Sequence, residues 1–177
     1  KKIGEHRGGY DPFSFDITDA LNDAGENELI VRVWDPTNDG PQPRGKQVKD
    51  PRGIWYTSVS GIWQTVWLEP VAAVSIRGLK FAPDIDNKSL ELTVESSAAG
   101  ESLVVKAEAY EYERKIGETI GFAGQLLHVP VPGAKLWSPD SPHLYDLRVT
   151  LLRDGKEIDR VDSYFGMRKI ELAKDSK

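Results

Sequence analysis

The sequence has 177 residues, 39% of them hydrophobic and 29% charged, a composition typical of one or two globular domains rather than of a disordered chain. No apolar run approaches the roughly 20 residues that cross a bilayer, and the net charge of −5 accompanies scattered Lys and Arg, so we expect neither a membrane nor a nucleic acid as partner. Cysteine is absent, which excludes disulfides and thiolate chemistry and leaves the cellular compartment undetermined.

Short strands are predicted along almost the whole chain, because apolar and polar residues alternate with a period of two. The alternating segments are residues 13–17, 28–34, 61–68, 90–94, 103–109 and 145–151. Asp154-Gly155 predicts a tight hairpin turn into a return strand. Ile158 and Val161 are out of phase there, which indicates a bulge. We therefore predict an all-β fold.

Residues 16–23 form the one segment with the pattern of a helical turn, for which Thr18 or Asp19 is the predicted cap.

A domain boundary is predicted near residues 70–73, where Pro70 cannot donate to a sheet and a new alternating series begins. The second part, residues 73–172, has the length and the some seven short strands of an immunoglobulin-like β-sandwich. The first part, residues 1–72, supplies only about half of the roughly eight strands of a jelly roll. Its missing strands lie on another segment or chain, or its sheet edges stay open.

The connection over residues 35–53 exceeds the length of about 12 to 15 residues beyond which loops in compact domains are usually functional or disordered. Its three prolines before Lys46 limit its freedom. A working loop and a solvated excursion are the two readings, and the sequence does not decide between them.

The sequence contains no recognisable catalytic motif. The chain has 28 acidic residues, so pairs of carboxylates carry little information, and no Gly-x-Ser-x-Gly motif is present. His6, His128 and His143 lie far apart and lack the spacing of metal ligands. We predict no catalytic residue, no metal site and no cofactor in this segment.

The strand predicted at 61–68 is apolar on both faces. Ile62 and Val66 share one face, and Trp63 and Trp67 lie on the other. Indole faces can stack on sugar rings, but tryptophan also fills cores and domain interfaces. We favour the second reading, in which another piece of protein covers Trp63 and Trp67.

The segments IGEHRGGYDPFSFDIT, NELIVRVWDPTNDGPQPRGKQ, GIWYTSVSGIWQTVWLEPV and LWSPDSPHLYDLRVTLL with SYFGMRKIEL follow one another in the chain. Together they resemble glycoside hydrolase family 2, the β-galactosidase and β-glucuronidase group, over nearly the whole sequence. The resemblance implies the last half of a galactose-binding-like jelly roll, then an immunoglobulin-like sandwich, and at residues 173–177 the start of a linker to a catalytic barrel. The family's barrel, which holds both catalytic glutamates of these retaining enzymes, has no counterpart here.

No catalytic glutamate can therefore be assigned, and the isolated chain is expected to be inactive. The resemblance implies instead that Asp35, after the strand at 28–34, lies near a bound sugar, with Arg44, Lys46 and Gln47 as further substrate-binding candidates. The alternative for Asp35 is an Asx cap on the turn at Pro36.

His6 and Tyr10 are expected to be structural, because they flank a Gly8-Gly9 turn that needs open backbone angles.

Three functions remain open. The first is the ancillary, non-catalytic sandwich region of a bacterial glycosidase, periplasmic or cytoplasmic, whose partners are the carbohydrate substrate, the barrel and the missing jelly-roll strands. The second is a separate carbohydrate-binding module that uses the tryptophans. The third is a structural, adhesin-like pair of sandwiches. A homo-oligomer that pairs open sheet edges is compatible with each.

Overall fold

The computed structural model describes residues 1–98 and 102–172 of the chain. They divide into two compact units, Lys1–Leu68 (unit 1) and Glu69–Lys177 (unit 2), each of which is described by itself. Strands are the main regular elements, and the described ranges contain no α-helix, so the predicted all-β class is confirmed. The predicted linker at 173–177 lies outside the described residues.

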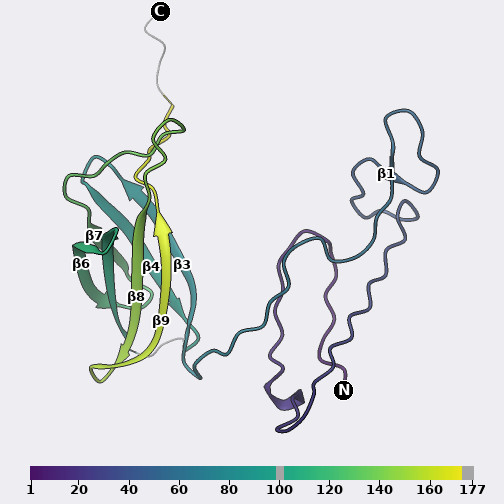
Figure 1. The fold of residues 1–177 in the computed structure, drawn as a ribbon, viewed down its shortest axis with the longest axis horizontal. Helices are drawn as coiled ribbons and strands as arrows, with labels where there is room; N and C mark the ends of the chain where they lie inside the picture. The colour runs from purple at the N-terminus through teal and green to yellow at the C-terminus, as the bar shows by residue number, and fades with distance from the viewer. Residues whose placement is uncertain (99–101, 173–177) are drawn as a thin grey trace, which may run out of the picture. The chain divides into compact units, whose positions relative to one another are not determined.

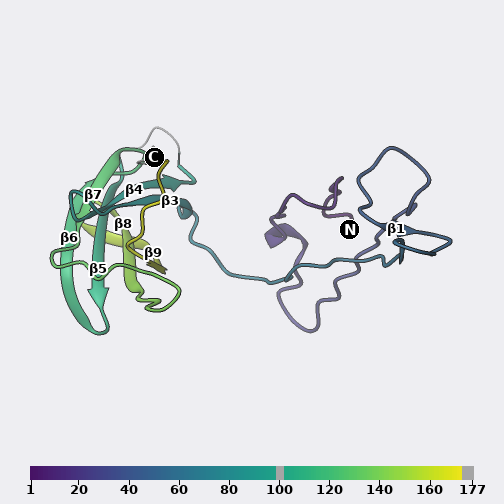
Figure 2. The same ribbon diagram turned by 90° about the horizontal axis from the view of Figure 1, so that it is seen from above.

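Unit 2 is a sandwich of two antiparallel sheets, with β5 and β8 at the centre of the larger one (Figure 1, Figure 2). The smaller sheet has the order β3-β4-β7 and the larger the order β6-β5-β8-β9. The strands are β3 (Ile76–Asp84), β4 (Ser89–Ser96), β5 (Val104–Glu111), β6 (Arg114–Phe122), β7 (Leu126–Pro130), β8 (Tyr145–Arg153) and β9 (Lys156–Phe165). The predicted sandwich is confirmed.

The core lies between the two sheets and is built from the alternating positions of the sequence. Because successive side chains in a strand point to opposite faces, one residue in two along β4, β5 and β8 enters the core. The buried apolar residues are Leu90, Leu92, Val94, Leu103, Val105, Ala107, Ala109, Leu127, Val129, Val131, Tyr145, Leu147, Val149, Leu151, Phe165 and Met167. They form one continuous cluster, which is what stabilises unit 2.

The β8–β9 hairpin has the predicted turn and the predicted bulge. Asp154 and Gly155 both have positive φ, 51° and 74°, as a two-residue hairpin turn of this hand requires. The register shifts between Leu151 and Leu152 on β8, so that Ile158 on β9 is left without an opposite residue. The irregular phase of the return strand is therefore a bulge.

Two glycines let β7 approach the inner face of β6. A side-chain carbon at Gly117 would overlap the carbonyl oxygen of Pro130, and one at Gly121 would overlap the side chain of Leu127. These positions pair with Ala109 and Val105 of β5, so they face the core. Glycine is thus required here for close packing rather than for an unusual backbone angle.

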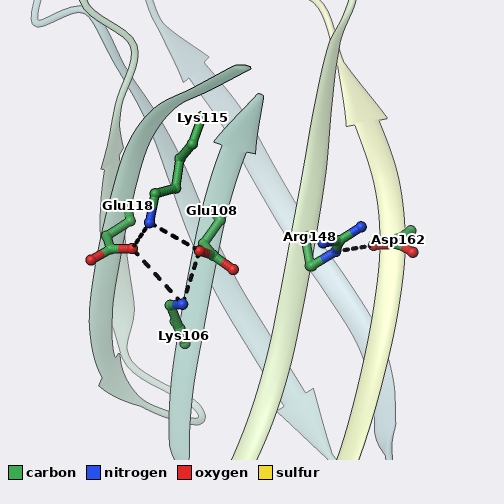
Figure 3. A network of polar contacts seen from close by, with 6 residues as sticks. All are labelled: Lys106, Glu108, Lys115, Glu118, Arg148 and Asp162. Carbon is green, nitrogen blue, oxygen red and sulfur yellow. Dashed lines mark hydrogen bonds and ion pairs between the residues drawn. The ribbon is translucent and has the colours of Figure 1, made fainter. Parts of the chain in front are cut away.

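The outer face of the larger sheet carries a network of ion pairs (Figure 3). Lys106 and Lys115 both contact Glu108, at 2.8 and 3.2 Å, and Lys115 also lies 2.5 Å from Glu118. Burial raises the pKa of Glu108, but the hydrogen bonds from Lys106 and Lys115 outweigh it, so this pKa lies below its ordinary value. The charged side chains on this face of β5 and β6 are thus paired with one another.

The same face continues across β8 and β9, where the guanidinium of Arg148 lies 2.9 Å from Asp162 (Figure 3).

The loop between β7 and β8 is fastened to the β5–β6 hairpin by Glu111. Its carboxylate, with 13% of the side chain exposed, lies 2.6 Å from Lys135 and 3.0 Å from Arg114. His143 packs edge-on against Tyr145, and its Nε2 lies 3.4 Å from Glu111 Oε1. The hydrogen bond from Lys135 lowers the pKa of Glu111.

Unit 1 contains far less regular structure than the sequence predicts. Its strands are β1 (Gln47–Val48) and β2 (Tyr56–Thr57), which pair in parallel. The strands predicted at 13–17, 28–34 and 61–68 are wrong for this structure, because these segments have no ladder partners among the described residues. Their apolar side chains are exposed instead, as at Ile30 (79%) and Leu68 (74%).

The predicted helical turn is present as the 3-10 helix η1 (Thr18–Ala20), but its predicted cap is wrong. The backbone N–H of Thr18 donates to Asp16 Oδ1 at 2.9 Å, so Asp16 holds the start of the turn.

Candidate functional site

The connection at 35–53 has internal hydrogen bonds, although most of its residues are exposed. The backbone N–H of Tyr56 donates to the carbonyl of Lys46 at 2.8 Å, which starts the β1–β2 pairing. The N–H of Lys49 donates to Asn38 Oδ1 at 3.0 Å, and this bond closes the loop on itself. Gly45 and Gly53 have positive φ at the turns on either side of β1. The chain thus has a defined path from the end of 28–34 to β2.

Asp35 is the first residue of this loop, and both of its carboxylate oxygens accept hydrogen bonds. Oδ1 accepts the N–H of Thr37 at 2.7 Å, and Oδ2 accepts the hydroxyl of Ser60 at 3.1 Å. The first bond is the Asx cap considered as the alternative reading of this residue. The second bond connects the loop to a segment 25 residues away. Asp35 is therefore a fixed acceptor whatever else it binds.

Three of the four predicted site residues lie around one small pocket. The pocket has a volume of about 60 Å³, and its lining comprises Tyr10, Asp35, Thr37, Pro43, Arg44, Gln47 and Ser58. Lys46 does not belong to it, because its ammonium lies over the ring of Tyr56, 5.7 Å from the centroid. Small-molecule pockets usually measure roughly 300 Å³ or more, so this hollow is too small to hold such a ligand by itself.

The polar groups at the pocket are arranged by local contacts. Gln47 Oε1 accepts the N–H of Val59 at 2.8 Å, which fixes the side-chain amide. The guanidinium of Arg44 lies 5.8 Å from the ring centroid of Trp55. A carboxylate acceptor therefore stands beside guanidinium and amide donors, a combination that can bind hydroxyl groups.

Sequence reasoning did not place Tyr10 and Ser58 at this pocket. Tyr10 follows the Gly8-Gly9 turn, in which Gly8 has a φ of 100°, and the sequence predicts a structural role for it there. Ser58 follows β2 immediately and has no motif around it. Neither carries a local signal, since only the contact of the loop with distant segments brings them to Asp35.

The tryptophans of unit 1 are not part of a core. Trp34, Trp63 and Trp67 are 79%, 67% and 71% exposed. The indole N–H of Trp63 donates to the carbonyl of Gly9 at 2.7 Å, so this residue has a structural contact at its polar edge. The rings themselves remain open on the surface of unit 1.

His6 stacks on Phe13 with 4.3 Å between ring centroids, which agrees with a structural role.

Glu108 and Glu118 of unit 2 are arranged for charge pairing rather than for acid–base chemistry. Glu108 and Glu118 share Lys115 on the outer face of the larger sheet (Figure 3). A general acid needs a raised pKa, whereas the lysines lower that of Glu108. In the ranges 1–98 and 102–172 no group of three or more metal-binding side chains comes together. No helix among these residues is long and apolar enough to span a bilayer.

Comparison with known proteins gives a consistent family. The family described as Glycosyl hydrolases family 2 matches residues 74–168, more than half of the chain. A β-galactosidase of Thermoanaerobacter pseudethanolicus is 25% identical over 186 residues, covering 99% of this chain and 24% of its own length. A β-galactosidase of Leuconostoc mesenteroides is 30% identical over 182 residues, with coverages of 91% and 16%.

Among solved structures, a β-glucuronidase from Ruminococcus gnavus aligns with a TM-score of 0.48 and 17% identity, over 58% of this chain and 17% of that one. The chain spans about a quarter or less of the curated relatives named above. On the match over residues 74–168, the chain belongs to glycosyl hydrolases family 2.

Proposed function

We propose that this chain is an ancillary, non-catalytic region of a family 2 glycosidase, in which unit 1 supplies one wall of the sugar pocket. The observation that carries the proposal is the meeting of Asp35, Arg44 and Gln47 around one hollow. Their acceptor and donors suit sugar hydroxyls, and the hollow is too small to hold a ring by itself. The acid and the nucleophile of a retaining reaction then come from a barrel outside these residues.

The substrate of the whole enzyme is a β-galactoside in this proposal, with a β-glucuronide as the alternative. Both named relatives are called β-galactosidases. Unit 1 selects among sugars through hydrogen bonds to hydroxyls, since an unpaired polar group in a closed site costs about 1 to 3 kcal/mol.

The apolar surface of unit 1 supports a second part of the proposal, that other polypeptide segments cover it. Ile30, Trp34 and Leu68 are each more than 70% exposed in the chain by itself. The first choice is completion by the remaining strands of the jelly roll and by the barrel, and the second is pairing with another copy through open edges. Analytical ultracentrifugation of the chain separates these, because only the second predicts a stable dimer.

Two assays test the main proposal. The chain alone should not hydrolyse nitrophenyl β-galactoside or β-glucuronide. In the longer enzyme, Asp35→Asn should raise KM by about tenfold while kcat falls less, because the carboxylate binds substrate and takes no part in bond cleavage. Asp50→Asn is the matched control in the same loop. Turnover by the chain that disappears when one of its own carboxylates is replaced would disprove the proposal.

A separate carbohydrate-binding module is the second candidate, and the exposed rings of Trp34, Trp63 and Trp67 favour it. Calorimetric titration of the chain with galactose, glucuronate and oligosaccharides distinguishes the two. Saturable binding that is lost in Trp67→Ala and kept in Asp35→Asn supports the module. Absence of binding by the chain, with the KM effect in the longer enzyme, supports the pocket wall.

A further inference from the structure

Unit 2 has a hollow of about 240 Å³. Its lining comprises Ile85, Leu136, Trp137, Ser138, Pro139, Met167, Arg168 and Lys169. Three segments line it: the turn after β3, the β7–β8 loop and the segment after β9. Leu136 pairs with Met167 in a parallel bridge, and the N–H of Trp137 donates to the carbonyl of Met167 at 2.9 Å.

The floor of this hollow is apolar. Ile85 and Leu136 contribute aliphatic surface, and Leu136 is 54% exposed, whereas Met167 is fully buried. Ser138 supplies a hydroxyl, but its Oγ already accepts the N–H of Ser141 at 3.1 Å. The side chains of Ile85 and Leu136 offer no hydrogen-bond partner to hydroxyl groups, so an aliphatic group fits better against them.

Cations stand at the rim of the same hollow. Lys169 is neutralised, because it lies 2.7 Å from Asp86 and 2.9 Å from Glu171, and their hydrogen bonds raise its pKa. Arg168 lies over the indole of Trp137, 4.8 Å from the ring centroid, and forms no ion pair with any described carboxylate. The stacking fixes the guanidinium and leaves its N–H donors available to an anion.

We propose that this hollow binds a polypeptide segment from outside residues 1–177 that presents an aliphatic side chain next to a carboxylate. The aliphatic group packs against Ile85 and Leu136, and the carboxylate pairs with Arg168. Charge complementarity selects this occupant, since one of the two rim cations is left without a counter-ion. A sugar is disfavoured because the guanidinium already covers an indole face on which a ring would stack.

The experiment uses the whole chain, labelled with ¹⁵N, and follows the indole N–H signal of Trp137, which is identified by its loss in Trp137→Phe. The probes are the blocked dipeptide acetyl-Leu-Glu-amide, its neutral counterpart acetyl-Leu-Gln-amide, and acetyl-Ala-Glu-amide. We expect a saturable shift with the first probe. Binding should be about three- to fivefold weaker with each of the other two, as loss of an exposed charge pair or of an aliphatic group predicts.

The variants make the assignment specific. Arg168→Gln should bind the glutamate and glutamine peptides equally, whereas Arg77→Gln, an exposed cation on β3, should leave the preference unchanged. Both replacements are at exposed positions, so neither threatens the core. Equal binding of the two peptides to the wild-type chain, or an unchanged preference in Arg168→Gln, contradicts the proposal. Tighter binding of glucuronate than of acetyl-Leu-Glu-amide also contradicts it and identifies a sugar site.

Discussion

The indole nitrogen of Trp63 donates to the carbonyl oxygen of Gly9 at 2.7 Å, across 54 residues of sequence. This bond fastens the turn at Gly8-Gly9, which leads to Tyr10 at the candidate pocket, to the segment after β2. An exposed tryptophan thus has a positional function, independent of any sugar that its ring could stack on.

Replacing Trp63 with phenylalanine keeps an aromatic ring and removes the N–H donor. We expect the turn to open more often, by about fivefold, because a hydrogen bond contributes about 1 kcal/mol. Limited trypsin digestion should therefore cleave after Arg7 correspondingly faster. Trp67→Phe, for which no such bond exists in the described structure, is the control, and equal cleavage rates in the two variants would refute the role of the bond.

Asp35→Ala should loosen the loop at 35–53, because two hydrogen bonds, from Thr37 and Ser60, are lost together. Cleavage by trypsin after Arg44 is expected to rise by about tenfold, the effect of roughly 1.4 kcal/mol. Asp35→Asn keeps an acceptor oxygen and should show a smaller rise. If Asp50→Ala, at the far end of the loop, accelerated cleavage equally, Asp35 would have no special part in holding it.

Gly117→Ala should destabilise unit 2 by about 1 to 3 kcal/mol, the usual cost of overpacking. The added methyl group overlaps the backbone carbonyl of Pro130, which cannot move aside without shifting β7. Gly78→Ala is the control on β3, where the methyl group would meet only the flexible end of Glu95. Urea unfolding followed by circular dichroism gives both free energies, and similar midpoints would contradict the packing argument.

Glu111→Gln should destabilise unit 2 at neutral pH and much less in acid. The hydrogen bond from Lys135, followed by that from Arg114, lowers the pKa of Glu111, so the folded state favours the charged form. This contribution is complete above the pKa of the unfolded chain, about 4.3, and disappears as the pH falls through the lower folded value.

Urea midpoints of wild type and variant, measured between about pH 7 and pH 3, should therefore converge below about pH 4. Glu113→Gln, at an exposed carboxylate of the same turn, is the matched control. A separation between wild type and Glu111→Gln that stays constant down to pH 3 would contradict the ion-pair explanation.

The sandwich of unit 2 was predictable wherever one face of a strand is buried. Leu103, Val105 and Ala107 keep an even phase, and the structure buries all three. The strand β6 gave no such signal, because its core-facing positions Gly117 and Gly121 carry no side chain to display a period. The position of β6 depends on its packing against β7, and a local sequence pattern carries no information on that contact.

In unit 1 the sequence pattern predicted strands that the structure does not contain. Residues 28–34 alternate as a strand should, yet they have no ladder, since alternation states which face is apolar and not which strand is adjacent. The loop residues Asp35, Arg44 and Gln47 line one pocket, whereas Lys46 lies over Tyr56 instead. Their part in substrate binding stays a prediction. Contacts between distant segments decided these outcomes.

The two glycines of β6 also restrict the register in which this strand can pair. A slip of this strand by a single position would bring a neighbouring side chain, such as that of Glu118, to the spot where not even a methyl group fits beside Pro130. Such an alignment would clash with Pro130 when β7 of the smaller sheet packs against the larger one.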